Sequence, residues 1–388
     1  MQTNTFSKSH RKDLIHICFV SRPKLSITSF FNIWHKQVDI LVANRTRLIR
    51  EYGIQLHFTN SLPEKKYDVI IVLSRFFADV DKQQKIEVLK KLRPLTPDLL
   101  WFSERDSAGF TEFEVLPYVD RYFCKHIYKD RELYNHTLYY NRAFVEYYAN
   151  TFHLEREPFE PNEPLSKYAE HEHKIGLWWN IAYNNVSMIA RWRWLMHTYL
   201  LQKTYPFKKP QILNSDQHKS YDLHALFVSK DQRGHIDYHR KYARTLISKF
   251  KGISLPEINR RLPERKYVDL IRDSKCIFSP FGWGEICYRD FTTFLAGGCL
   301  LKPTVDDIET WPKVLIENET YVPLKWDLSD LEEKLHYYLQ HTEEREKIAL
   351  QGYQTYMNIW SDAGIRQLLD HFSDIVFNRE LKHLTVQP

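Results

Sequence analysis

Glycine and cysteine are both scarce in this chain of 388 residues, which contains 11 glycines and five cysteines. The cysteines, at positions 18, 124, 276, 287 and 299, are odd in number and form no C-x-x-C pair. Those at 18, 276 and 299 lie in apolar runs, where a free thiol behaves as a small hydrophobic side chain. The pattern argues against a disulfide scaffold and predicts a reducing compartment.

Long apolar runs are absent as well. No stretch approaches the roughly 20 residues that a membrane-spanning helix needs, and the first 13 residues lack the apolar core of a signal peptide. We therefore expect a cytoplasmic protein. Basic clusters at 8–12, 191–194, 203–209 and 259–266 accompany a net charge of +6. Such clusters attract nucleotide phosphates, nucleic acid or an anionic membrane surface, so a peripheral contact with the inner face of a membrane is a further expectation. A solvated surface is the simpler interpretation of each cluster alone.

The length fits two domains, and the apolar runs fall into two series. Short runs separated by longer charged or periodic segments are typical of βαβ units and parallel sheets. The first series comprises 14–20, 54–58, 68–74, 98–103 and 118–123, and the second comprises 174–179, 211–213, 223–229, 276–279, 299–303 and 321–326. The predicted organisation is an α/β domain over 1–154, a proline-rich linker over 155–173, a second α/β domain over 174–355 and a C-terminal helix over 356–388.

The most informative segment spans residues 276–311, where a predicted strand leads into a glycine-broken loop and a helix. Four of the 11 glycines fall at positions 282, 284, 297 and 298. Because glycine is favoured where a backbone must approach another group closely, this clustering in a glycine-poor chain marks a binding loop. Backbone N–H groups at the start of a helix attract anions. Glu285 at this place would repel phosphate, but it suits the two hydroxyls of a ribose.

This segment resembles the C-terminal half of the GT-B fold glycosyltransferases. In that superfamily a Glu, seven residues and a second Glu precede an A-x-G-x-P-V turn. Glu285 matches the first Glu and LAGGCLLKP matches the turn, whereas Thr292 or Thr293 stands where the second Glu is expected. Arg289 is similar to the arginine of exostosin-like transferases. The resemblance implies two Rossmann-like domains with a C-terminal helix crossing back to the first. It also implies a nucleotide-sugar donor, which is a substrate and not a cofactor.

Several residues of the second half are candidates for holding the donor. Gly282, Gly284 and Glu285 belong to the loop itself, and Arg289 lies one helical turn later. Cations at strand ends could neutralise the leaving phosphates, and an amide could bind sugar hydroxyls. The further donor-binding candidates of this kind are Lys302, Lys230 and Asn180.

The first half is expected to supply the acceptor side and the catalytic base. In open α/β sheets ligands bind beyond the carboxyl ends of the strands. Asp106 is the first candidate for the base and Glu104 the second, because both follow the run at 98–103. Arg22 and Arg75 follow two other runs and are candidates for binding an anionic acceptor or the leaving diphosphate.

Metal chemistry is not expected from the sequence. No D-x-D of the kind that metal-dependent transferases use stands directly between apolar strands, and the histidines have no convincing partners. We therefore predict no metal site and no cofactor. The acidic loop formed by Asp306, Asp307 and Glu309 could touch the sugar, but a solvated charge run is the preferred interpretation.

The predicted function is transfer of a sugar from a nucleotide-activated donor to a saccharide or lipid-linked acceptor, in cell-surface polysaccharide biosynthesis. The alternatives are a nucleic-acid-binding protein or DNA-base glycosyltransferase, a nucleotide-sugar epimerase, and a non-catalytic sugar-binding domain. Thr292 and Thr293 in place of an acid keep the last alternative open. The donor base, the sugar, the acceptor, the anomeric outcome and the oligomeric state are not specified by the sequence.

Overall fold

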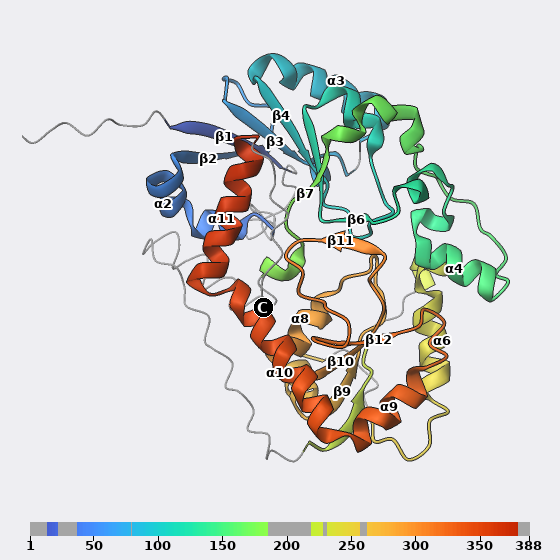
Figure 1. The fold of residues 1–388 in the computed structure, drawn as a ribbon. Coiled ribbons are helices and arrows are strands. Elements are labelled where there is room, and N and C mark those ends of the chain that lie inside the picture. Colours follow the sequence, from blue (N-terminus) through green and yellow to red (C-terminus); the bar gives the residue numbers. More distant parts are fainter. Residues whose placement is uncertain are drawn as a thin grey trace, which may run out of the picture.

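The computed structural model describes residues 14–21, 37–78, 80–184, 219–227, 231–256 and 262–378. These residues form two α/β domains, each built on a parallel sheet, with C-terminal helices that run from the second domain to the first (Figure 1). The α-helices are α1 (Asp39–Ala43), α2 (Arg45–Arg47), α3 (Lys82–Leu92), α4 (Ala143–Thr151), α6 (Tyr238–Ile247), α7 (Glu264–Arg272), α8 (Tyr288–Leu295), α9 (Leu331–Gln340), α10 (Thr342–Ile359) and α11 (Asp362–Val376).

The first domain contains a six-stranded sheet in the order β2-β1-β3-β4-β5-β7, and all its pairs are parallel. Parallel sheets are covered on both faces, which explains why β3 consists of five buried aliphatic residues. The strands are β1 (Ile15–Val20), β2 (Ile54–Thr59), β3 (Val69–Leu73), β4 (Asp98–Phe102), β5 (Arg121–Cys124) and β7 (Ile175–Leu177).

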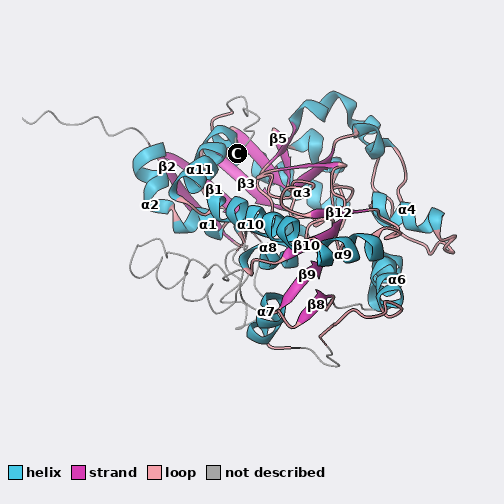
Figure 2. Ribbon diagram, turned by 60° about the horizontal axis from the view of Figure 1, so that its bottom comes forward, coloured by secondary structure: helices cyan, strands magenta, loops and turns pink. Residues whose placement is uncertain are grey.

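The second domain contains a four-stranded parallel sheet in the order β12-β10-β9-β8. Helices α7 and α9 contact β9, and α8 and α10 contact β10 (Figure 2). The strands are β8 (Tyr221–His224), β9 (Ser274–Phe278), β10 (Cys299–Pro303) and β12 (Val322–Leu324). Gly297 ends the turn between α8 and β10 with a φ of 67°, a conformation that favours glycine.

A two-stranded antiparallel sheet joins the domains. Strand β6 (His126–Tyr128) follows β5 of the first sheet in sequence, and β11 (Ile308–Thr310) follows β10 of the second. The ladder continues in the backbone bond from Lys129 N to Asp307 O at 2.9 Å. The domains therefore meet along a hydrogen-bonded seam.

The C-terminal helix crosses back to the first domain, as the resemblance implied. Helix α10 packs against α8 and β10, whereas α11 lies beside the first sheet (Figure 1). Phe372 on α11 stacks on Phe19 of β1 with ring centroids 6.2 Å apart, and the edge of its ring meets Trp179. The expected fold class, two Rossmann-like domains with this crossover, is confirmed.

One predicted strand lies in a different sheet from the one expected. The run at 174–179 was expected to open the second series, but β7 pairs with β5 and forms the edge of the first sheet. A short apolar run carries no information about which neighbour it pairs with, because pairing is decided by tertiary packing. The run at 211–213 lies outside the described residues. The domain boundaries remain predictions.

All five cysteines are free, and four of them are buried. Among the described residues, no helix is long and apolar enough to cross a membrane.

Candidate active site

The glycine-broken loop lies where the sequence predicted it, between the carboxyl end of β9 and the start of α8. Its C-terminal end is fixed by Asp290, whose carboxylate accepts hydrogen bonds from Cys287 N at 2.8 Å and from the Ser279 hydroxyl. The buried ammonium of Lys302 lies 3.1 Å from the same carboxylate. Asp290 therefore ties both ends of the loop to the core of the second domain.

Lys302 was a candidate for neutralising the leaving phosphates, but its surroundings in the fold do not fit that role. Its side chain is fully buried, paired with Asp290 and 5.2 Å from the centre of the Phe281 ring. A charge that is compensated inside the core does not face a bound phosphate. Lys302 thus supports the loop through Asp290. This geometry does not provide the expected contact between Lys302 and the donor.

Two arginines of the second domain contact the loop, and a third lies beside them. Arg289 donates from Nε to the Tyr267 hydroxyl at 2.9 Å, and one terminal nitrogen lies 3.5 Å from the Ser279 hydroxyl. Arg240 on α6 donates from Nε to the carbonyl of Phe281 at 2.6 Å. Arg244, one turn later, lies over the same Phe227 ring as Arg289. Guanidinium groups bind phosphate in a fixed two-point geometry, so this cluster is suited to an anionic ligand.

The sequence identified Arg289 but missed Arg240 and Arg244. Both lie on an amphipathic helix far from the glycine motif in sequence, and no local pattern points to them. Gly282 shows why the loop accepts Arg240. A Cβ built on Gly282 would lie 3.1 Å from a terminal nitrogen of Arg240, so the glycine permits this close approach.

Glu285 is buried at the seam, and both of its carboxylate oxygens have partners in the first domain. Oε1 accepts from the Ser107 hydroxyl at 2.8 Å, and Oε2 accepts from Ala108 N at 3.1 Å. Burial raises the pKa of Glu285, and these hydrogen bonds act in the opposite direction. The carboxylate that was expected to face a ribose instead joins the two domains.

Asp106 precedes Ser107 in the same loop, and its side chain is 43% exposed. Lys125 Nζ lies 2.9 Å from its carboxylate, and a terminal nitrogen of Arg75 lies 3.7 Å away. Burial acts to raise the pKa of Asp106, but the two cations outweigh it and lower the pKa to about 2. Asp106 is therefore ionised at neutral pH and accessible from solvent.

Glu104 and Arg75 have different surroundings. Glu104 is 2% exposed, and its carboxylate accepts a hydrogen bond from the backbone N of Arg75 at 3.1 Å. It is not positioned to meet an acceptor hydroxyl. The Arg75 side chain is 53% exposed beside Asp106, and its contact with an acceptor stays a prediction. Arg22 and Lys230 lie outside the described residues.

Asn180 is a structural residue in this fold. Its Nδ2 donates to the Thr310 hydroxyl at 2.8 Å and to Pro312 O at 2.9 Å, and its Oδ1 accepts from Ala182 N at 2.8 Å. The side chain is buried, and its amide is occupied by these bonds. The expected contact between Asn180 and the donor is not provided by this geometry, because the side chain caps a helical turn beside the seam.

Asp307 was read as part of a solvated charge run, but both of its carboxylate oxygens are buried. Within the described part of the chain they have no hydrogen-bond partner. Burial and the nearby charge of Glu285 raise the pKa of Asp307 to about 7. Two acidic side chains therefore share the interior of the seam.

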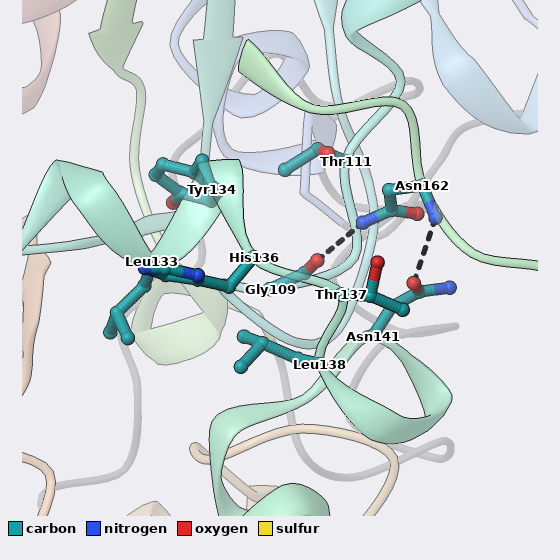
Figure 3. A pocket seen from close by; sticks show the side chains of 9 residues that line it. All are labelled: Gly109, Thr111, Leu133, Tyr134, His136, Thr137, Leu138, Asn141 and Asn162. Atoms are coloured by element: carbon teal, nitrogen blue, oxygen red, sulfur yellow. Dashed lines mark hydrogen bonds between the residues drawn. The ribbon is translucent and has the colours of Figure 1, made fainter. Parts of the chain in front are cut away.

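A small cavity lies behind the loop that carries Asp106. It measures about 10 Å³, the size of a single water molecule. Asn162 closes it, donating to Gly109 O at 2.6 Å and to the Asn141 side chain from its backbone at 2.8 Å (Figure 3). The cavity is too small for a sugar or a nucleotide. Among the described residues, no group of three or more His, Cys, Asp or Glu side chains is placed to hold a metal ion.

Two α/β domains, each built on a parallel sheet, meet at the glycine-broken loop, and a C-terminal helix crosses back to the first domain. This arrangement is that of the GT-B class of fold. Residues 234–369 match the glycosyl transferase-like family, and this range contains the loop, α8 and the three arginines. The glycosyltransferase class expected from the sequence is confirmed by this match. No curated protein matches the chain.

Solved structures similar to this chain include one from Rickettsia africae and one from Anabaena. A glycosyltransferase from Rickettsia africae is 11% identical with a TM-score of 0.45, over 95% of this chain and 100% of that one. HepE from Anabaena, solved in complex with UDP and glucose, is 8% identical with a TM-score of 0.42, over 94% of this chain and 100% of that one.

Proposed function

We propose that this protein transfers a sugar from a nucleotide-activated donor to a saccharide or lipid-linked acceptor, in cell-surface polysaccharide biosynthesis. The observation that supports this proposal best is the cluster of Arg240, Arg244 and Arg289 around the glycine-broken loop. It lies within the range that matches the glycosyl transferase-like family.

The leaving group of such a reaction is a nucleotide, whose phosphates gain charge as the sugar departs. Arg289 and Arg240 meet this charge in the proposed mechanism, with help from the N-terminus of α8. The protein then needs no metal ion and no cofactor for this step. Each guanidinium is held by a hydrogen bond from its Nε, so its terminal nitrogens are already oriented before the donor arrives.

Asp106 is the proposed base that accepts the proton of the acceptor hydroxyl. Its carboxylate is ionised and exposed, and Glu104 is buried, so the geometry favours Asp106. A pKa of about 2 makes Asp106 a weak base. The proton is therefore transferred late, once the hydroxyl has begun to attack the sugar and has become acidic. Arg75 beside it is the proposed contact for an anionic acceptor.

The acceptor class, a cytoplasmic location and a peripheral contact with an anionic membrane all belong to this proposal. They follow from the resemblance and from the basic composition of the chain.

A thermal-shift screen with UDP, GDP, CMP and dTDP tests the donor. A ligand at 100 times its Kd stabilises the folded protein by roughly 2.7 kcal/mol. We expect one nucleotide to raise the melting temperature, in the presence of EDTA as well as without it. Arg289→Lys should reduce the affinity by roughly ten- to hundredfold, since it removes two-point hydrogen bonds to a charged group.

Arg272→Lys is the matched control, because Arg272 is an exposed arginine at the end of α7 that pairs only weakly with Asp269. It should leave the nucleotide response unchanged. If none of the four nucleotides stabilises the protein, the proposed donor class is wrong.

A further inference from the structure

The glycine-broken loop is attached to the first domain by three consecutive residues. Arg142 donates from Nε to the carbonyl of Trp283 at 2.8 Å. Gly284 lies against the backbone of Asp106, so closely that a Cβ built on it would lie 1.6 Å from the Asp106 carbonyl oxygen. Glu285 then accepts the hydrogen bonds from Ser107 and Ala108. We call this set of contacts the seam clasp.

The seam clasp is buried and charge-assisted. Glu285 is 1% exposed and Arg142 is 6% exposed. Their opposite charges attract each other within the buried part of the seam. Hydrogen bonds to an ionised acceptor are stronger than those between neutral groups. Breaking them would leave a buried carboxylate without partners, which is costly. The loop of the first domain is therefore held firmly whenever the domains are closed.

Tyr140 and Asn141 bring Arg142 to the clasp. Both have positive φ angles, 51° and 57°, a conformation that non-glycine residues adopt at a cost. Backbone strain of this kind persists only where surrounding contacts compensate for it. The bond from Arg142 to Trp283 and the bond from Asn162 N to the Asn141 side chain are such contacts.

The segment that the clasp holds is the one that carries Asp106. Asp106 contacts Gly284 through its carbonyl, and Ser107 and Ala108 bond to Glu285. The carboxylate of Asp106 leaves this anchored backbone towards Lys125 and the exposed side. Its position relative to the second domain is therefore set by Glu285 and Gly284.

We infer that Glu285 is a positioning residue, which fixes the Asp106–Ala108 segment against the second domain and contacts neither the donor nor the acceptor. The inference rests on the proposed function, because the place of Asp106 matters to turnover only if Asp106 takes part in the transfer. A shift of about 1 Å in a reacting group can lower the rate by roughly a hundredfold. Glu285 then controls turnover without setting the affinity for the nucleotide.

Three variants test this inference: Glu285→Leu, Glu285→Gln and Ser107→Ala. Leucine removes both acceptors, whereas glutamine keeps the length and can still accept from Ala108 N. We expect Glu285→Leu to speed hydrogen exchange at the Ala108 amide and to lower kcat by roughly ten- to hundredfold. Glu285→Gln should keep most of the slow exchange at the Ala108 amide and most of the kcat of the wild type. Adding Ser107→Ala to Glu285→Leu should change either quantity little further.

In all three variants, the Kd for the stabilising nucleotide should stay within about twofold of the wild type. Glu319→Leu, at an exposed position of the same domain, is the control and should change none of these quantities.

Direct contact with the ribose predicts the opposite set of results. The Kd would then rise about ten- to hundredfold in Glu285→Gln, with Ala108 exchange unchanged, and this would overturn the inference. The exchange measurement needs no activity, so it separates the two proposals. Faster exchange in Glu285→Leu, together with a wild-type protein that binds no nucleotide, would support the clasp and contradict the proposed function.

Discussion

Asp106 and Asp307 are carboxyl groups from the two domains, and their surroundings move their pKa values in opposite directions. Lys125 and Arg75 outweigh the effect of burial and lower the pKa of Asp106 to about 2. Burial and the charge of Glu285 raise the pKa of Asp307 to about 7. The first group is therefore charged throughout the physiological range, and the second titrates within it.

Asp307→Asn should stabilise the protein in a pH-dependent way. The folded-state pKa of Asp307 lies above the ordinary value of 3.8, so the folded protein binds this proton more tightly than the unfolded chain does. Its contribution to stability is full below about pH 4 and is lost as the pH rises towards 7. The variant should exceed the wild type in melting temperature by more at pH 8 than at pH 5. Asp306→Asn, at an exposed neighbour whose charge contributes less than burial and Glu285 to the raised pKa of Asp307, should show a smaller trend. Equal effects of Asp307→Asn at both pH values would contradict the raised pKa.

Asp106→Asn should lower kcat by roughly a hundredfold to ten-thousandfold, the usual range for the loss of a positioned proton acceptor. Nucleotide affinity should be nearly unchanged, because Asp106 lies in the first domain and the arginine cluster lies in the second. Steady-state kinetics and calorimetry measure the two quantities separately. The control is Asp130→Asn, at an exposed helix cap where asparagine serves equally well. Near-normal turnover in Asp106→Asn would place the base elsewhere.

At the scale of elements, the loop between β9 and α8 shows how far a sequence pattern reaches. The clustering of glycines in a glycine-poor chain predicted the position of this loop correctly, and the apolar runs predicted the positions of most strands. The partners of Glu285 could not be predicted, because Ser107 and Ala108 lie 178 and 177 positions away in the chain. Lys302 and Asn180 were expected to face a ligand because they follow predicted strands. Lys302 pairs with Asp290 instead, and Asn180 caps a helical turn. Such pairings depend on tertiary packing.

Gly284→Ala and Gly282→Ala form a matched pair that tests how the loop docks. A Cβ at position 284 would lie 1.6 Å from a backbone oxygen that cannot move away easily. At position 282 the nearest atom, 3.1 Å away, belongs to the flexible end of Arg240. We expect Gly284→Ala to lower the free energy of unfolding by at least about 1–3 kcal/mol, as overpacking does, and to reduce turnover. Gly282→Ala should have the smaller effect on stability in denaturant titrations. The reverse order would show that the seam is not packed as described.

At the scale of the whole molecule, several contacts besides the seam clasp join the domains in the described part of the chain, among them the β6–β11 ladder and the C-terminal crossover. The β6–β11 ladder links them at the centre, and α11 packs on the first sheet after α10 has packed on the second. Tyr52 reinforces the crossover through a 2.6 Å hydrogen bond from its hydroxyl to Asp370. The C-terminal helix is therefore part of the core of the first domain.

Phe372→Ala should lower the free energy of unfolding by about 3–5 kcal/mol, the usual cost of removing a buried aromatic ring. Phe372 is fully buried between Phe19 and Trp179. Phe19 lies in β1 and Trp179 follows β7, so both contacts are with parts of the chain far from α11 in sequence. Leu350→Ala, at an exposed position on α10, should change it by no more than about 0.5 kcal/mol. Equal effects of the two substitutions, measured by denaturant unfolding, would argue against the crossover as a core element.

The most direct test of the account is nucleotide release from a panel of UDP-, GDP-, CMP- and dTDP-sugars, measured in the presence of EDTA with a mixture of saccharide acceptors. The account predicts that one donor is consumed, that EDTA leaves the rate unchanged because Arg240 and Arg289 neutralise the leaving phosphates, and that Arg289→Lys slows the reaction. Complete loss of release on chelation, restored by Mn²⁺ or Mg²⁺, would contradict the metal-independent mechanism. Failure to consume any donor under both conditions would contradict the proposed transfer itself.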